Sequence, residues 1–180
     1  MIAVYDFGGG TFDAAVLRRS ATGFELLGVP EGMERLGGID FDQAVLAHVD
    51  GSLGGLVSSA DRSDPQTLPA QARLRVDARR AKETLSTDAD TSVPVALPGV
   101  NTEVRLTRVE FEAMVRPRIA QTVSALERTV ASAGLTMADV SRILLVGGTS
   151  RMPVVAEIVG SSTGRPVSID THPKMAIATG

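Results

Sequence analysis

The stretch VYDFGGGTFD (residues 4–13) places three consecutive glycines between two aspartates, close to the first residue of the chain. An apolar run, residues 2–6, precedes the glycines and β-compatible residues 12–18 follow them, which predicts a hairpin with the glycines in its bend. Each glycine loses more backbone entropy on folding than any other residue, so stability alone does not explain the run. The bend is therefore expected to let another group approach the backbone.

The group that best fits this bend is a phosphate with a magnesium ion. Successive N–H groups of residues 8–10 can converge into a concave nest, and without Cβ atoms they let phosphate oxygens come within hydrogen-bonding distance. Thr11 adds a hydroxyl donor, and Asp6 and Asp13 flank the bend, where carboxylates can hold Mg²⁺ through its water shell. The alternative is a tight hairpin whose glycines only supply positive φ, with both aspartates in solvent.

A second glycine turn lies in VGGTSRMP (residues 146–153). A flat ring or a ribose can lie against the bare backbone of Gly147 and Gly148, and the guanidinium of Arg151 can stack on an adenine face. The alternative is an ordinary strand-to-helix connection with Arg151 in solvent.

Hydrophobic periodicity divides the remaining chain into strands and helices. Thr107 and Glu110 form a capping-box pattern at the start of a long helix, which Pro117 is expected to kink or split. Asp40 and Ser150 are expected to cap two other helices. The expected strands cover residues 24–29, 93–97, 104–106, 142–146 and 166–169, and the expected helices cover residues 41–49, 70–86, 107–126 and 152–159, with a further helix start at His172. Alternation of strand, glycine turn, helix and strand is typical of a parallel α/β arrangement.

The composition excludes several classes of function. The 180 residues are 43% hydrophobic and 22% charged with a net charge of −3, which predicts a folded, soluble protein without a global attraction for nucleic acid or anionic lipid. The absence of cysteine excludes a thiolate zinc site and fits a cytoplasmic location. No apolar run reaches the length of a membrane helix. With one tyrosine and no tryptophan for base stacking, the basic run over residues 73–82 favours a solvated helix face.

Six ordered segments resemble the nucleotide-binding domain of heat shock protein 70 (DnaK-like) chaperones, members of the actin-like ATPase superfamily. The segments are DFGGGTFD, GGIDFD, RRAKETLS, LTRVEF, LLVGGTSRMP and HPKMAIATG, and they span almost the whole chain. The resemblance implies the second lobe of a two-lobed ATPase, so the chain is expected to be a piece of a longer protein. Its expected fold is an α/β, actin-like (ribonuclease H-like) subdomain made of residues 1–37 and 109–180, with a smaller α+β subdomain, residues 38–108, inserted.

The resemblance also implies ATP or ADP with Mg²⁺ as ligands, and it assigns residues to them. Asp6 and Asp13 match positions near the magnesium ion. The residues matched to nucleotide contacts are Gly8, Gly9, Gly10 and Thr11 at the phosphates, Lys82 and Ser86 at the ribose and adenine, and Gly147, Gly148, Thr149 and Arg151 in the adenosine loop. The family's remaining phosphate and magnesium contacts belong to the first lobe. We therefore expect no catalytic residue here and little ATP hydrolysis by this segment alone.

Four positions depart from the family pattern. Arg79 replaces a glutamate that accepts hydrogen bonds from the ribose, and a guanidinium offers no acceptor. Glu83 replaces an arginine that stacks on the adenine in some members, and Ile39 and Lys174 each replace an acidic residue. These departures support one alternative, a degenerate nucleotide domain that acts as an interaction module. Another alternative is a lobe of an actin-like cytoskeletal or scaffold ATPase.

The resemblance extends to partners. It implies the first lobe of the same protein, cochaperones, and a nucleotide exchange factor that grips residues 38–108. It also implies client polypeptides held by other domains, in protein folding and the stress response. Neither nucleic acid nor a membrane is expected to bind this segment.

Overall fold

The computed structural model describes residues 1–169, so the expected helix start at His172 and the departure at Lys174 lie outside the described residues. The chain divides into two compact units. The first unit joins Met1–Ile39 to Arg116–Gly180, and the second unit is Asp40–Val115. The two divisions between the units fall inside helices α1 (Gly38–Ser52) and α3 (Arg108–Ser132), so each of these helices contributes residues to both units.

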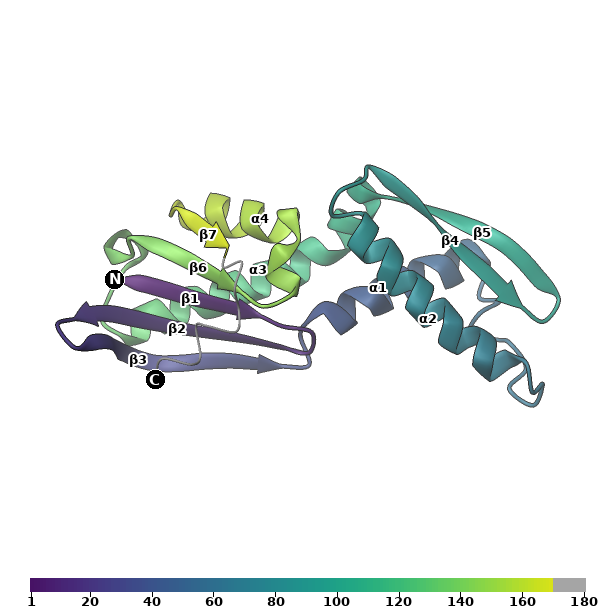
Figure 1. Ribbon diagram of the computed structural model, residues 1–180, viewed down its shortest axis with the longest axis horizontal. Helices are drawn as coiled ribbons and strands as arrows, with labels where there is room; N and C mark the ends of the chain where they lie inside the picture. Colours follow the sequence, from purple (N-terminus) through teal and green to yellow (C-terminus); the bar gives the residue numbers. More distant parts are fainter. Residues whose placement is uncertain (170–180) are drawn as a thin grey trace. The chain divides into compact units, whose positions relative to one another are not determined.

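A five-stranded mixed sheet forms the first unit, with strand order β3-β2-β1-β6-β7 (Figure 1). Strands β1, β2 and β3 make an antiparallel meander, while β6 pairs in parallel with β1 and with β7. The bounds are Ile2–Phe7 for β1, Thr11–Ser20 for β2, Gly23–Glu34 for β3, Arg142–Val146 for β6 and Val167–Ile169 for β7. The expected hairpin and parallel strands are confirmed, but β3 continues five residues beyond its expected end at Val29 because its pairing with β2 extends to Thr11 opposite Glu34.

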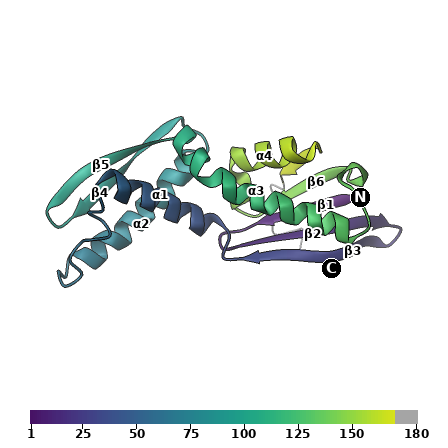
Figure 2. The ribbon, with the colours of Figure 1, turned by 180° about the vertical axis from the view of Figure 1, so that it is seen from behind.

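The buried face of this sheet is aromatic and lies under α3, which crosses it in Figure 2. Alternate residues of β1 and β2 point to this face, so Tyr5, Phe7 and Phe12 are fully buried and contact one another edge to face. The Tyr5 hydroxyl bonds Thr122 Oγ1 on α3, which donates to the Ile119 carbonyl at 2.6 Å. These contacts hold the β1–β2 hairpin against α3.

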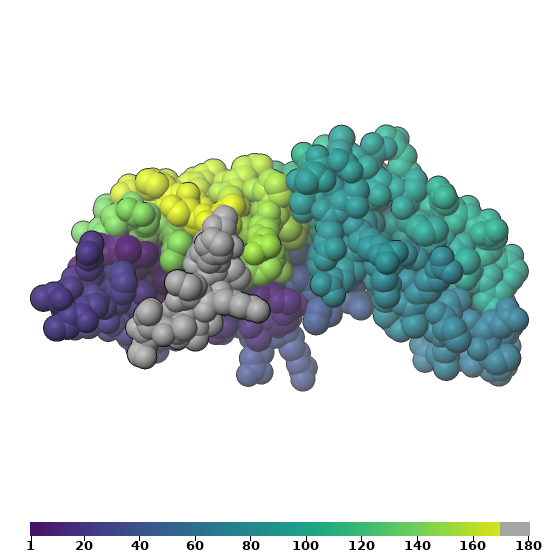
Figure 3. Space-filling view, in the orientation of Figure 1, coloured from purple at the N-terminus to yellow at the C-terminus, as the bar shows by residue number. Residues whose placement is uncertain are grey.

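A parallel β6–α4–β7 connection completes the first unit. Helix α4 (Pro153–Thr163) and β7 lie side by side on the surface of the unit (Figure 3). Ser150 was expected to cap this helix, but the N-cap residue is Met152, and the Ser150 hydroxyl instead donates to the Val146 carbonyl at 2.6 Å. A short 3-10 turn, Thr149–Arg151, separates the strand from the helix and moves Ser150 away from the helix terminus.

The second unit combines helices with a β-hairpin. Helix α2 (Thr67–Thr84) packs on strand β4 (Asp90–Leu97), which pairs antiparallel with β5 (Val100–Thr107). The apolar residues that recur at helical spacing along α2 and its C-cap are all buried, namely Leu74, Ala78, Ala81 and Leu85. Helix α1 adds Phe41, Val45 and Val49 to the buried residues of the unit. The expected hairpin and both helices are therefore confirmed.

Two expectations about helix ends and kinks need correction. Helix α1 begins at Gly38, so Asp40 lies in its first turn and not at its N-cap. Helix α3 runs through Pro117 without a break, so Pro117 does not split it, although its ring leaves one carbonyl of the preceding turn without an amide donor. The capping box is confirmed, because the Thr107 amide donates to Glu110 Oε2 at 2.9 Å and the Glu110 amide to Thr107 Oγ1 at 3.3 Å.

Across residues 1–169, no helix combines the length and apolarity that crossing a bilayer requires.

Candidate functional site

The glycine bend between β1 and β2 is held by hydrogen bonds from three segments of the first unit. Its Gly8 amide donates to the Thr11 carbonyl at 2.9 Å, which closes the bend. The Gly8 carbonyl accepts from Thr149 Oγ1 at 2.8 Å and from the Gly38 amide at 3.2 Å, and the Gly9 carbonyl accepts from the Ile39 amide at 2.8 Å. The carbonyls of the bend therefore satisfy the first amides of α1, which explains why that helix starts two residues before Asp40.

The conformation of the bend does not require its glycines. None of residues 8–10 has a positive φ, so the alternative in which these glycines only supply positive φ is wrong. A Cβ atom added at Gly9 or Gly10 would meet no atom of the described residues within 4 Å. By contrast, a Cβ at Gly37 would lie 2.5 Å from the Gly10 nitrogen. Gly37 thus lets α1 approach the bend, whereas Gly9 and Gly10 leave an open space beside their own backbone.

Two carboxylates stand next to this open space. Asp6 and Asp13 are direct cross-strand partners on β1 and β2, and they lie on the face of the sheet opposite the buried aromatic residues. Burial raises the pKa of Asp6, and the negative charge of Asp13 raises it further. Within residues 1–169 no cluster of three or more potential metal ligands occurs, so a cation here would have two protein carboxylates at most. This donor set suits Mg²⁺, which takes one or two carboxylates and completes its shell with water and phosphate oxygens.

The second glycine turn follows β6, the parallel neighbour of β1, and therefore lies at the same edge of the sheet as the bend. Gly147 has a φ of +90°, and a Cβ there would lie 2.6 Å from Asp6 Oδ1 and would also overlap the Phe7 carbonyl. Gly148 has an ordinary helical conformation and open space where a Cβ would be. Arg151 is exposed at the end of the turn. The two turns are joined directly, because Thr149 is the residue that donates to Gly8.

The remaining predicted contacts belong to the second unit and lie on or just beyond α2. The ammonium group of Lys82 is 2.7 Å from Asp42 Oδ1 on α1, and both side chains are largely buried, at 12% and 18% exposure. Ser86 follows the helix, and its amide donates to the Glu83 carbonyl at 3.1 Å. Arg79 Nε donates to Glu83 Oε1 at 3.1 Å, so the two departures from the family pattern pair with each other one helical turn apart.

Two residues that support the site were not predicted to do so: Gly37 contacts the bend closely, and Asp42 pairs with Lys82. Thr149 was predicted in the adenosine loop, but its hydroxyl donates to the Gly8 carbonyl of the bend. The only signal in the sequence was the paired glycine at residues 37 and 38, which marks a backbone close to another segment. The contacts of Thr149 and Asp42 depend on segments far away in the chain, and no local pattern indicates them.

The fold and its paired glycine turns define the class of protein: an α/β domain fragment of the actin-like ATPase type. The model of the family described as "Hsp70 protein" matches residues 1–180. The chain therefore belongs to the Hsp70 family, and this match favours the chaperone interpretation over the cytoskeletal and scaffold alternatives.

Individual relatives agree with this assignment. The chain is similar to proteins named "Chaperone protein HscA homolog" from Pseudomonas putida, Bordetella pertussis and Shewanella denitrificans. The identities are 38% over 180 residues, 36% over 181 residues and 33% over 180 residues, and they cover 100%, 99% and 100% of this chain. The chain spans only 27–28% of the length of these relatives. The resemblance thus extends over the whole chain but over a limited part of each relative.

Proposed function

We propose that this chain supplies one half of a magnesium–ATP/ADP site to a molecular chaperone of the Hsp70 type. In this proposal residues 8–11 receive the phosphates, and residues 147–151 receive the adenosine. The opposite half of the site, including the groups needed for hydrolysis, comes from a first lobe. The segment binds nucleotide through these loops and is not expected to hydrolyse it alone.

One observation carries the proposal: Gly9, Gly10 and Gly148 border open space without any conformational need for glycine. Glycine at such positions costs backbone entropy and gains nothing from packing inside the described chain. The cost is understandable if a ligand approaches the backbone closely, as phosphate oxygens do when they accept hydrogen bonds from successive amides. All three glycines lie at the edge of the sheet where β1 and β6 end.

The carboxylates fit the same proposal. Unliganded, Asp6 and Asp13 repel each other beside the bend, and adding phosphate would increase the negative charge. A magnesium ion held near these two carboxylates would supply positive charge that offsets both repulsions. Asp6 lies on β1, which pairs with β6, and Asp13 lies opposite it on β2, which pairs with β3. The two carboxylates would therefore hold the hydrated cation from two adjacent strands.

In the second unit we propose that Lys82 and Ser86 contribute contacts to the ribose and adenine. The exchanged pair Arg79 and Glu83 is the observation that favours the second candidate, a nucleotide domain that has lost affinity and acts as an interaction module. We also propose a cytoplasmic location, a role in protein folding and the stress response, and cochaperones, an exchange factor and client polypeptides as partners of the intact protein.

Calorimetric titration of Mg-ADP into the intact protein tests the main proposal. Gly10→Ala places a methyl group in the open space and should weaken binding about tenfold or more, which corresponds to about 1.4 kcal/mol. Gly51→Ala is the matched control, since it also meets open space but lies at the end of α1, far along the chain from both glycine turns. Equal affinity of both variants and the unmodified protein would refute the assignment of the bend.

An Arg79→Glu variant separates the two candidates. If the unmodified protein binds Mg-ADP, the altered pair is tolerated and a nucleotide-driven chaperone cycle is supported. If only Arg79→Glu binds, the unmodified protein has lost its nucleotide site and the interaction module is supported.

A further inference from the structure

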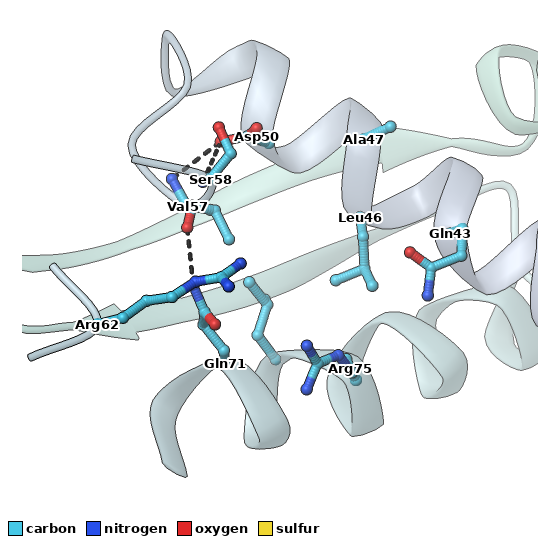
Figure 4. Close-up of a pocket in the computed structure, with 10 residues that line it drawn as sticks. Gln43, Leu46, Ala47, Asp50, Val57, Ser58, Arg62, Gln71 and Arg75 are labelled. Atoms are coloured by element: carbon cyan, nitrogen blue, oxygen red, sulfur yellow. Dashed lines mark hydrogen bonds between the residues drawn. The ribbon is translucent and has the colours of Figure 1, made fainter. Parts of the chain in front are cut away.

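A hollow lies between α1 and α2 in the second unit. It has a volume of about 310 Å³ and is open to solvent on one side (Figure 4). Its walls come from three segments: α1, the loop between the helices, and α2. The residues that matter for its chemistry are Leu46, Val57 and Leu74 at its apolar base, Arg62 and Arg75 at its rim, and Gln71.

The rim carries two guanidinium groups, those of Arg62 and Arg75. Figure 4 shows Arg62 reaching the hollow from the loop and Arg75 reaching it from α2. Within residues 1–169 neither forms an ion pair, although neighbouring arginines on α2 do: Arg73 and Arg80 lie 3.8 and 3.7 Å from the carboxylate of Asp77. Two cations that face one hollow repel each other, and a bound anion would remove that repulsion.

The acidic residue in the lining is already occupied by the protein itself. Asp50 Oδ1 accepts hydrogen bonds from the amides of Val57 and Ser58 at 2.9 and 3.0 Å. Hydrogen bonding by the Ser58 side chain lowers the pKa of Asp50, and the two amides lower it further. Asp50 therefore fixes the loop that presents Arg62. Gln71 is also fixed, because its Nε2 donates to the Val57 carbonyl at 2.9 Å, so the wall of the hollow is built before any ligand arrives.

We propose that this hollow binds an acidic peptide segment of a partner protein, with a carboxylate between Arg62 and Arg75 and an adjacent aliphatic side chain on Leu46 and Leu74. Guanidinium groups match the planar geometry of a carboxylate, and two of them discriminate strongly against its neutral amide. The apolar base favours a ligand that carries carbon beside its charge over a free inorganic anion. The lining offers no aromatic side chain for stacking a base, which disfavours a nucleic acid.

The test is a titration of the intact protein with the blocked octapeptide (Leu-Glu-Leu-Asp)₂ and with its neutral counterpart (Leu-Gln-Leu-Asn)₂. We expect the acidic peptide to bind about tenfold more tightly than the neutral one and its binding to weaken about tenfold in Arg75→Gln and in Arg62→Gln. Arg73→Gln on the same helix, outside the lining, is the matched control and should bind normally. All three arginines are exposed, so their replacement leaves the fold intact.

The methyl signals of Leu46 and Leu74 in nuclear magnetic resonance spectra locate the bound peptide, which separates this hollow from any other peptide site in the intact protein. We expect both signals to shift with the acidic peptide. Unchanged signals, equal binding of the neutral peptide, or equal loss in Arg73→Gln would overturn the proposal. Acetate alone binding as strongly as the peptide would also overturn it, because the apolar base would then have no role. The hollow shares no residue with the nucleotide site, so neither proposal depends on the other.

Discussion

Replacing Gly147 by alanine should damage the first unit severely, whereas the same change at the next residue should not. Gly147 has a φ of +90°, where an alanine is strained by about 1–3 kcal/mol. Its new methyl group would also lie 2.6 Å from Asp6 Oδ1 and from the carbonyl carbon of Phe7. Phe7 is part of β1 and cannot move without disturbing the sheet, so this overlap should cost about 1–3 kcal/mol more. The expected loss is about 2–6 kcal/mol in total.

Gly148→Ala is the matched control for this prediction. Gly148 has φ −65° and ψ −39°, and a Cβ there meets no atom of the described residues within 4 Å. Alanine is compatible with that conformation and should change stability by less than about 1 kcal/mol, with stabilisation the more natural direction. If the open space beside Gly148 is a ligand site, this variant should nevertheless bind Mg-ADP more weakly.

Native-state hydrogen exchange measures the loss of stability in the strands next to Gly147, which are β1 and β6. Amides of β1 and β6 should exchange about 30-fold faster or more in Gly147→Ala, which corresponds to a loss of about 2 kcal/mol or more, and should be nearly unchanged in Gly148→Ala. Two results would refute the reasoning. One is protection of β1 in Gly147→Ala equal to that of the unmodified protein, and the other is an equal loss in both variants.

Three further predictions concern polar groups that are buried or partly buried. Tyr5→Phe should lower the free energy of unfolding by about 1 kcal/mol, because one hydrogen bond is lost without leaving a cavity, and Tyr5→Ala by about 3–5 kcal/mol; equal losses in a denaturant titration would contradict this difference. Burial raises the pKa of Asp6 above its unfolded value, so the folded state binds the proton more tightly and loses stability as the pH rises from below the unfolded pKa through the folded one. Asp6→Asn should therefore abolish this pH dependence and stabilise the unliganded protein near pH 7, and it should weaken the binding of Mg-ADP. Unfolding midpoints measured over a series of pH values test the effect on stability. Asp42→Ala should cost about 1–3 kcal/mol because it removes the carboxylate 2.7 Å from the largely buried Lys82, whereas Arg18→Ala, at an exposed pair, should cost less than about 1 kcal/mol in the same assay.

The elements of the fold were predictable because their signals are local. The apolar run before the glycines and the β-compatible residues after them indicated the β1–β2 hairpin, and the helical spacing of apolar residues such as Leu74, Ala78 and Ala81 indicated α2. The capping box at Thr107 was readable for the same reason. The start of α1 at Gly38 was not, because it depends on a distant segment: the carbonyls of Gly8 and Gly9 accept hydrogen bonds from the first amides of α1. The expectation that Ser150 caps α4 also failed, because its hydroxyl donates to the Val146 carbonyl at the end of β6.

The candidate site was likewise predictable only where its signals in the sequence are local. The glycine motifs pointed to two turns, but nothing in the sequence joined them; the hydrogen bond from Thr149 to Gly8 does. Nor did the sequence show that Gly147 is required by its own conformation whereas Gly9 and Gly10 are not. Only the structure shows this difference, because the residue type is the same at all three positions. The pairing of Arg79 with Glu83 could have been predicted from helical spacing alone, because the two residues are four positions apart.

The buried aromatic group of the first unit has a spectroscopic consequence. Tyr5 is the only tyrosine among the 180 residues, and these residues contain no tryptophan. Its ring is fully buried, and burial raises its pKa, so the phenol should keep its neutral absorption spectrum in alkaline solution until the first unit unfolds. Any ultraviolet signal that this segment contributes near 280 nm therefore originates one residue away from Asp6. Unfolding of the second unit, whose aromatic residues are Phe41 and Phe111, would pass unnoticed at that wavelength.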